Sequence, residues 1–382
     1  MQSQKWVAGW GCAISTVAQA YAEYVKDQTF RYYIFSPMKG QAIRLHLSNE
    51  RGVMPSTVTK MTVAIATSET SIDVSTVKDV TFGGKESVTL EVGQKAVSDE
   101  IEFSVEAGQS YMVSMYFGEL THIASGHSNG GHFIKKHYGL GDHTGAERIP
   151  LELLGDGGPY VLLNTIDLLT DESDDCRAII AYGDSITAQP WPDFFNHRVF
   201  DSGIINRPII RKGIGGSRVL RDYQYRCRQH YGEKGILRFE KDIAQAGVDR
   251  VFILHGINDL IHPGGVYSPM SDLPTAQELI EGYKTYIAAA RRQGIKIYMA
   301  TILPCPRCMN GDGVREQVRC TVNDWIRNEA PIDGVIDFEA AVWDENDHKQ
   351  MKAEYDSGDH LHPSLAGAKK MADSIPMEFV TE

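Results

Sequence analysis

Several features that define large classes of proteins are missing from this sequence. No stretch approaches the roughly 18 uninterrupted apolar residues that a membrane-spanning helix needs. The N-terminal segment also lacks the cationic start and the continuous apolar core of a signal peptide. These absences predict a cytoplasmic protein with no membrane partner, unless a leader is missing from the sequence.

Long runs of lysine or arginine are absent as well. The chain has 38 basic and 50 acidic side chains, a formal net charge of −12 and a pI near 5.6. This balance argues against nucleic acid or an anionic membrane as a partner, so we expect neutral substrates. The 382 residues are 42% hydrophobic and 23% charged, which is ordinary for a folded chain and enough for two domains.

Cysteine is scarce, with six residues, which fits a reducing compartment. Cys305, Cys308 and Cys320 lie close together in the sequence, but a closed zinc site needs four ligands and the other cysteines are distant. No Walker A sequence is present, and no GxGxxG lies at a strand-to-helix turn. We therefore expect neither a metal nor another cofactor.

The first 170 residues show the alternation and β-branched content of sheet. The strand-like runs are 29–35, 42–48, 61–67, 87–92 and 110–117. No helix of three turns with a clear apolar stripe lies among them, so two antiparallel sheets packed face to face would bury these runs. We predict an N-terminal β-sandwich domain, jelly-roll-like, over residues 1–170.

Residues 118–145 are predicted to form a long polar crossover loop within this domain. The loop contains five histidines whose spacing matches no common metal-ligand pattern: His122, His127, His132, His137 and His143. Residues 126–130 also read GxSxG, which makes Ser128 a rival nucleophile. The residues around it are a poor buried strand and a poor helix start, so the context of a nucleophile elbow is missing.

From residue 178 the pattern changes to alternating strands and helices. Short apolar strands are expected at 178–182, 250–255, 295–302 and 334–338. Thr275 and Glu278 form a capping box for a helix that Gly294 closes, and a second helix is expected over 314–330. Such alternation predicts a parallel sheet with helices on both faces, in a domain covering 171–382.

The first of these strands leads directly into a candidate nucleophile. Gly183 and Asp184 are turn formers, and they leave Ser185 where the strand gives way to a connection. Ligands of open α/β sheets bind at the carboxyl ends of strands. Gly-Asp-Ser alone fits an exposed turn serine equally well.

Three further stretches fall where that sheet would present its loops. Residues 211–218 read RKGIGGSR, residues 255–259 read HGIND, and residues 356–363 read DSGDHLHP. They offer free backbone N–H groups at the glycines, a side-chain amide at Asn258, and Asp359 three residues before His362. Each alone could be a glycine turn, an Asx turn or a helix cap.

Together and in this order, the four stretches resemble the signature blocks of the SGNH (GDSL) hydrolase superfamily. The resemblance implies a flavodoxin-like αβα sandwich with its site at the carboxyl edge of the sheet. The segments RLHLSN, TFGG, VSDEIEF, GDHTG and VNDWI also resemble the two-domain bacterial branch of arylesterases and acetyl-xylan-esterase-like acylhydrolases. The CPRC loop and the histidine-rich crossover are not part of that pattern.

The resemblance implies a role for each matching residue. Ser185 would be the nucleophile, His362 its base, and Asp359 the group that orients the imidazole. The oxyanion would be bound by the N–H groups of Ser185 and Gly216 and by the side-chain amide of Asn258. His360 is a competing base, but it does not occupy the matching position.

Polar residues near the four stretches suggest a hydroxylated substrate. Trp191 is a candidate to stack on a sugar ring, with Arg218 and His255 as polar contacts. The leading hypothesis is a serine esterase that removes short acyl groups, above all acetyl, from xylo- or manno-oligosaccharides. The alternatives are a general arylesterase or lipase-type acylhydrolase, and a carbohydrate-binding protein with an inactive hydrolase domain. The oligomeric state stays open, a homodimer included.

Overall fold

The computed structural model describes residues 3–17, 24–127, 133, 135–224, 230–306 and 313–382. The chain divides into two compact units, one made of Met1–Ala178 with Gly203–Pro208 and the other of Ile179–Ser202 with Ile209–Glu382. Within the described ranges, no helix has the length and apolar character required to cross a bilayer.

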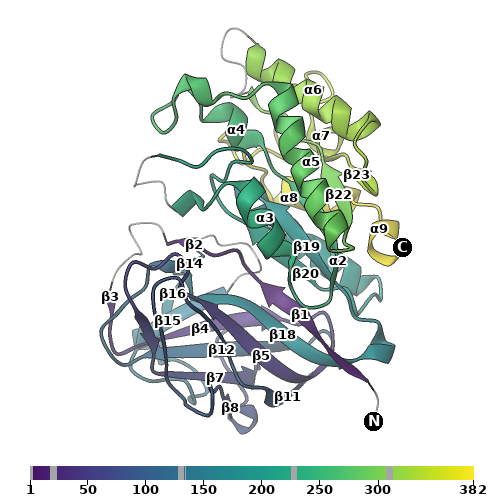
Figure 1. The fold of residues 1–382 in the computed structure, drawn as a ribbon. Coiled ribbons are helices and arrows are strands. Elements are labelled where there is room, and N and C mark those ends of the chain that lie inside the picture. Colours follow the sequence, from purple (N-terminus) through teal and green to yellow (C-terminus); the bar gives the residue numbers. More distant parts are fainter. Residues whose placement is uncertain (1–2, 18–23, 128–132, 134, 225–229, 307–312) are drawn as a thin grey trace. The chain divides into compact units, whose positions relative to one another are not determined.

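Two antiparallel sheets form the first unit (Figure 1). One has the order β1-β18-β5-β10, with β11 also paired to β5; the other has the order β16-β15-β4-β12-β7-β8. The first sheet consists of β1 (Gln4–Gly11), β5 (Gly40–Ser48), β10 (Lys95–Val97), β11 (Ile101–Val105) and β18 (Leu163–Asp171). The second consists of β4 (Gln28–Phe35), β7 (Lys60–Ile65), β8 (Lys78–Asp79), β12 (Ser110–Phe117), β15 (Lys135–Leu140) and β16 (Gly155–Asp156).

Side chains from the two sheets meet in the core of this unit. Phe103 of β11 packs edge-on against Tyr111 of β12, with ring centroids 6.1 Å apart. Both rings are buried, so the inner faces of the sheets bury each other's apolar side chains. The predicted antiparallel sandwich is therefore present.

Smaller strand pairs complete the unit, and several lie in the segment expected to be a polar loop. They are β2 (Ser15–Thr16), β3 (Tyr24–Val25), β6 (Ser56–Val58), β9 (Val88–Leu90), β13 (Thr121–His122), β14 (Ser125–His127) and β17 (Tyr160–Val161). With β13, β14 and β15, 11 of the described residues of 118–145 are strand rather than loop. His127 and His137 are buried in this part of the sandwich, so they are structural.

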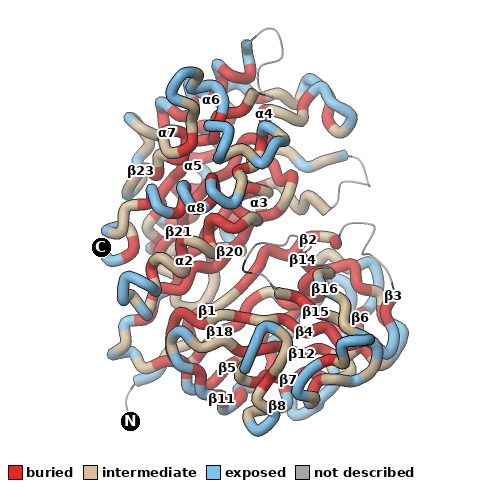
Figure 2. Tube along the Cα trace, turned by 180° about the vertical axis from the view of Figure 1, so that it is seen from behind, coloured by how far each residue is buried: buried red, intermediate tan, exposed pale blue. Residues whose placement is uncertain are grey.

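A five-stranded parallel sheet organises the second unit, in the order β20-β19-β21-β22-β23. Counted along the chain this order is 2-1-3-4-5, the flavodoxin-like arrangement. Its strands are β19 (Ala178–Gly183), β20 (Ile209–Gly213), β21 (Val248–Leu254), β22 (Lys296–Ala300) and β23 (Gly334–Ile336). Every residue of β19 is buried, as expected for a central strand covered on both faces. Its neighbours β20 and β21 are also largely buried (Figure 2).

Helices cover the two faces of this sheet and give a three-layer αβα domain. α3 (Gly235–Ile243), α5 (Ala276–Arg292) and α6 (Val314–Asn328) pack against one another, as do α2 (Trp191–Asp201), α7 (Phe338–Val342) and α8 (Leu365–Ser374). The shorter helices are α1 (Ser185–Ala188), α4 (Ile257–Ile261) and α9 (Glu378–Thr381).

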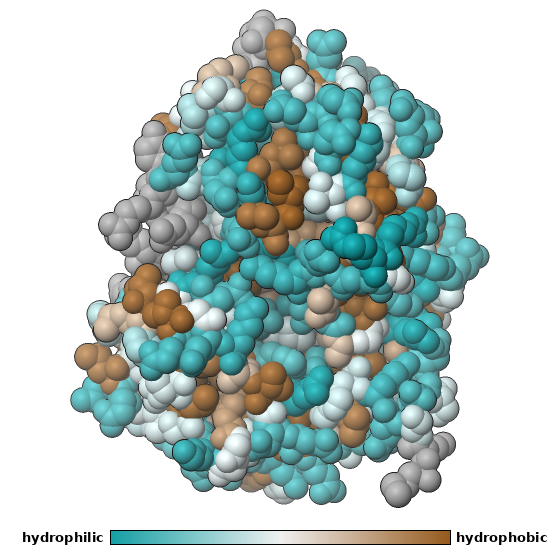
Figure 3. All heavy atoms as spheres, viewed as in Figure 1, coloured by the Kyte–Doolittle hydropathy of each residue, from teal (hydrophilic) through white to brown (hydrophobic). Residues whose placement is uncertain are grey.

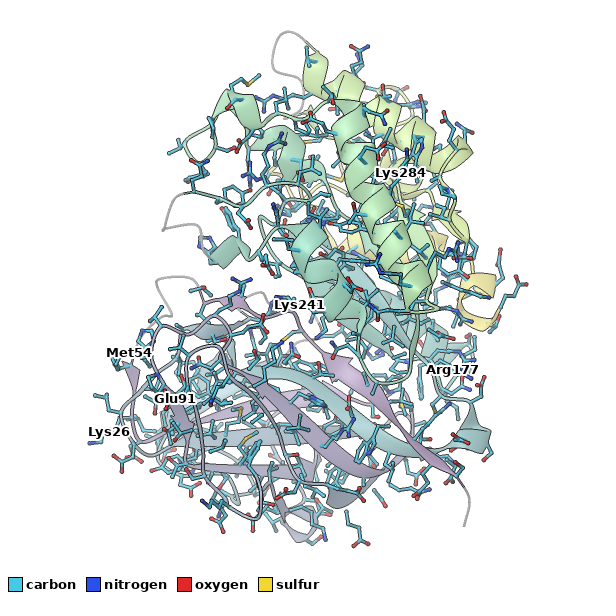
Figure 4. The ribbon with its side chains drawn as sticks, viewed as in Figure 1. Lys26, Met54, Glu91, Arg177, Lys241 and Lys284 are labelled. Carbon is cyan, nitrogen blue, oxygen red and sulfur yellow. The ribbon has the colours of Figure 1, made fainter. Side chains whose placement is uncertain are left out.

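The predicted capping box begins α5 and sets which face of the helix is buried. The Thr275 side chain accepts from the N–H of Glu278, and the Glu278 carboxylate accepts from the N–H of Thr275. Tyr283 and Tyr286 then point into the domain, whereas Lys284 lies on the outer face and pairs with Glu281 (Figure 4). This orientation brings the hydroxyls of Tyr283 and Tyr286 to His255, the residue that follows β21 at the carboxyl edge of the sheet. On the side of the molecule drawn in Figure 3, hydrophobic side chains form separate patches among hydrophilic ones.

Candidate active site

The candidate residues lie at the point where the strand order of the parallel sheet reverses. Ser185 begins α1 just after β19, and Asn258 lies in α4 just after β21, which neighbours β19. Gly216 follows β20, on the other side of β19. The loops after neighbouring strands leave in opposite directions at such a switch point, and this creates a crevice for a ligand.

A hydrogen-bonded chain joins the candidate nucleophile to two residues near the C-terminus. Ser185 Oγ lies 2.8 Å from His362 Nε2, and His362 Nδ1 lies 2.6 Å from Asp359 Oδ2. An ionised carboxylate only accepts hydrogen bonds, so Nδ1 carries the proton and Nε2 is left to accept from the serine hydroxyl. This is the tautomer that a general base for Ser185 requires.

The Asp359 carboxylate is held in place by its own loop. Its Oδ1 accepts the backbone N–H groups of Leu361 and His362 and the hydroxyl of Ser357. Burial works to raise the pKa of Asp359, but the N–H donors and the His362 imidazole outweigh it and leave that pKa well below its usual range. The group therefore stays ionised at neutral pH.

Three candidate donors lie in the loops after neighbouring strands. Ser185 is the first residue of α1, and Gly216 has a φ of +76°, which favours glycine. Within the described ranges, neither N–H is used by another residue. Asn258 Nδ2 donates one hydrogen to the carbonyl of Ser217 at 3.0 Å, and no described residue accepts its second. These donors could bind an oxyanion formed beside Ser185.

Two buried carboxyls support these loops. Asp184 Oδ1 accepts from the N–H of Ile186, and Asp259 accepts the N–H groups of Val219 and Leu220. Burial raises the pKa of Asp184 to about 7 and that of Asp259 to about 6. Asp259 thus links α4 to the segment after the glycines. The sequence analysis treated Asp184 only as a turn former and gave Asp259 no role, although each is next to a candidate site residue.

The three expected substrate contacts are buried in the core instead. The exposed fractions of Trp191, Arg218 and His255 are 1%, 2% and 2%. The Trp191 indole packs against Phe338, with ring centroids 5.2 Å apart. A ring with this burial has no face open to a sugar, so the stacking hypothesis for Trp191 is not supported.

Arg218 has an architectural role in this structure. Its guanidinium hydrogen-bonds to Ser268, Asp272 and the carbonyls of Arg221 and Asp222, and it lies 4.2 Å from the centroid of the Tyr223 ring. These partners occupy the donors that a substrate hydroxyl would need. Arg218 therefore orders the loops around it rather than contacting substrate.

The competing residues do not displace the Ser185 assignment. The side chain of His360 is 67% exposed and pairs with Asp356 at 2.7 Å, not with Ser185. Ser128 and Cys308 lie outside the described residues. Among the residues that the structure does describe, no group of three or more histidine, cysteine, aspartate or glutamate side chains could hold a metal.

Comparisons with known proteins concern the second unit. Residues 181–370 match the family model of the GDSL-like lipase/acylhydrolase family. No curated protein matches the chain.

Solved structures cover a similar share of the chain. A GDSL-like lipase from Bacteroides thetaiotaomicron is 19% identical over 56% of this chain and 90% of its own, with a TM-score of 0.38. An acetyl xylan esterase is 19% identical over 52% and 96%, with a TM-score of 0.37, and an SGNH-hydrolase family esterase is 18% identical over 54% and 95%, with a TM-score of 0.35.

Proposed function

Because residues 181–370 belong to the GDSL-like lipase/acylhydrolase family, we propose that this chain is a serine esterase that removes acetyl groups from oligosaccharides. The observation that carries the proposal is the hydrogen-bonded chain from Ser185 through His362 to Asp359, at the carboxyl end of the parallel sheet. A metal or cofactor has no part in it.

In this proposal, the reaction begins with proton transfer to the imidazole. His362 Nε2 takes the Ser185 proton as Oγ attacks the ester carbonyl, and Asp359 stabilises the resulting imidazolium. The negative charge that forms on the carbonyl oxygen is bound by the N–H groups of Ser185 and Gly216 and by the Asn258 amide.

The second half of the proposed reaction reverses these proton transfers. His362 delivers its proton to the leaving alcohol, which departs and leaves an acetyl group on Ser185. A water then loses a proton to His362 as it attacks the acyl-enzyme, and acetate leaves as Oγ is reprotonated. Each half uses the same base and the same oxyanion donors.

The side chains around the site support a hydroxylated substrate and a short acyl group. Four of those that follow the segments and remain at least partly exposed are polar: Gln189, Arg221, Asp222 and His262. The apolar side chains at least partly exposed at the same places, Leu220, Ile261 and Leu365, each follow a different segment. A pocket for long acyl chains needs an extended apolar wall, which these residues do not provide. Segments of the sandwich also resemble two-domain acetyl-xylan-esterase-like acylhydrolases, as the sequence analysis noted.

A chain-length series tests the proposal. We expect kcat/KM to fall steeply from 4-nitrophenyl acetate to the octanoate, and acetate to be released from acetylated xylo- or manno-oligosaccharides. A preference for octanoate with no release from any acetylated sugar would favour the general arylesterase or lipase alternative. Absence of all ester hydrolysis would favour the carbohydrate-binding alternative.

Two serine variants serve as matched controls for that series. Ser185→Ala should retain only the ~10³- to 10⁴-fold residual catalysis over water that binding and oxyanion donors supply when a triad serine is lost. Ser128→Ala should behave as wild type. The reverse result would assign the nucleophile to Ser128.

A further inference from the structure

Two consecutive peptide carbonyls after β20 are held by side chains from other elements. The Gly216 carbonyl accepts the hydroxyl of Tyr223 at 2.8 Å. The Ser217 carbonyl accepts two donors, Asn258 Nδ2 at 3.0 Å and His255 Nε2 at 3.1 Å. The Asn258 amide is therefore bonded directly to the Ser217 carbonyl, and the Gly216 N–H lies on the peptide just before these two held carbonyls, in the same loop.

His255 can make this contact in only one neutral tautomer. A carbonyl oxygen accepts but does not donate, so Nε2 must carry the proton that binds Ser217. Nδ1 then accepts the hydroxyl of Tyr286 at 3.0 Å. Burial and the nearby Arg238 guanidinium hold the pKa of His255 well below its usual range, so the ring is neutral.

Helix α5 fixes the position of this imidazole. Tyr286 holds the ring of His255, and the hydroxyl of Tyr283, one turn earlier on α5, donates to the His255 backbone carbonyl. Gly235 leaves space for the arrangement, because a Cβ there would lie 1.9 Å from Tyr286 Oη and 2.7 Å from His255 Cε1. The ring is thus packed tightly and bonded through both nitrogens.

We propose that His255, oriented by Tyr286, is a positioning residue for the oxyanion site. It fixes the Ser217 carbonyl and with it the loop that carries the Gly216 N–H, and this carbonyl occupies one hydrogen of the Asn258 amide so that the other faces substrate. The inference rests on the proposed esterase function for its catalytic consequence. It replaces the expected role of His255 as a substrate contact, which its burial excludes.

A comparison of two substitutions at this position provides the main test. His255→Leu removes the donor to Ser217, whereas His255→Gln keeps an N–H of similar reach. Since a misplacement of about 1 Å can lower a rate about 10²-fold, we expect kcat to fall 10- to 100-fold in His255→Leu, with KM within twofold of wild type. His255→Gln should recover most of the loss.

Two further variants separate positioning from packing. Tyr286→Phe leaves the imidazole but removes its Nδ1 partner, so kcat should fall by about three- to tenfold at constant KM. Phe239→Leu removes the ring that stacks on Tyr286, with centroids 4.5 Å apart. It leaves the hydrogen bonds from Tyr286 to His255 and from His255 to the Ser217 carbonyl in place. It should lower the melting temperature and leave kcat unchanged.

The amide resonance of Gly216 in an ¹⁵N-labelled sample gives a readout that does not depend on activity. It should shift in His255→Leu and Tyr286→Phe, and stay near its wild-type position in His255→Gln and Phe239→Leu. An unshifted resonance in Tyr286→Phe, or equal losses of kcat in all four variants, would overturn the inference. If wild type hydrolyses no ester, the proposed function fails, while the resonance still tests the positioning role.

Discussion

The most specific prediction concerns Asp359→Asn. In wild type, Asp359 Oδ1 takes the N–H groups of Leu361 and His362, and Oδ2 faces His362 Nδ1 at 2.6 Å. An asparagine that keeps the backbone bonds with its oxygen turns its NH₂ group toward Nδ1. Two donors cannot share that contact, so the imidazole proton moves to Nε2, which can then no longer accept from Ser185.

The expected loss follows from this change of tautomer. Replacement of the aspartate in a Ser-His-Asp triad by asparagine lowers kcat by roughly 10⁴, which corresponds to about 5.4 kcal/mol at 1.36 kcal/mol per factor of ten. KM and the melting temperature should change little, because the substrate contacts and the backbone bonds to Asn Oδ1 persist. Initial rates with 4-nitrophenyl acetate, taken over a range of concentrations, separate kcat from KM.

A neighbouring histidine offers a matched control for this experiment. His360 has a φ of +59° and its own aspartate partner, and asparagine tolerates that backbone conformation. His360→Asn should therefore keep kcat within twofold of wild type. A loss of less than tenfold in Asp359→Asn, or a comparable loss in His360→Asn, would refute the assignment of Asp359 and His362.

Three other substitutions follow from the same geometry. Gly216→Ala would place a Cβ 2.3 Å from the Tyr231 ring at a φ of +76°, so we expect lower kcat and a stability loss of at least about 1–2 kcal/mol by chemical denaturation; wild-type values would contradict the described loop. Asn258→Ala should lower kcat by about 10²- to 10³-fold, and an effect on KM alone would show that the amide binds only ground-state substrate. In Asp184→Asn the dependence of stability on pH should be weaker: the folded pKa of about 7 exceeds the ordinary value of 3.8, so Asp184 makes wild type lose stability as pH rises from about 4 to 7, and the variant lacks this contribution. Melting temperatures measured across that range check this, and a constant difference between the two proteins would contradict it.

Local sequence signals predicted individual elements of the second unit well. The capping box at Thr275 and Glu278 begins α5, and the apolar run before Ser185 is the buried strand β19. The family resemblance paired Asp359 with His362, and the structure brings them into contact; a hydrogen bond over three residues depends mainly on local backbone. Such features need little information from distant parts of the chain.

Features that depend on distant partners were harder to predict. β15 reads KKHYGL, and its polar residues are buried only because the strand pairs with β4, about a hundred positions earlier. Arg218 looks like a surface cation in the sequence, yet Ser268 and Asp272 bind it in the interior. The direction in which a polar side chain points is a tertiary property, and no local pattern around Arg218 or His255 encodes it.

The wide separation of Ser185 and His362 along the chain has a consequence for biosynthesis. Their side chains meet at 2.8 Å but lie 177 positions apart, and the nucleophile is made first. At ~5–20 residues per second, a ribosome needs about 9–35 s to travel from one codon to the other. In the proposed mechanism the serine has no base to activate it throughout that interval, so we expect a nascent chain to be without esterase activity until its last helices emerge.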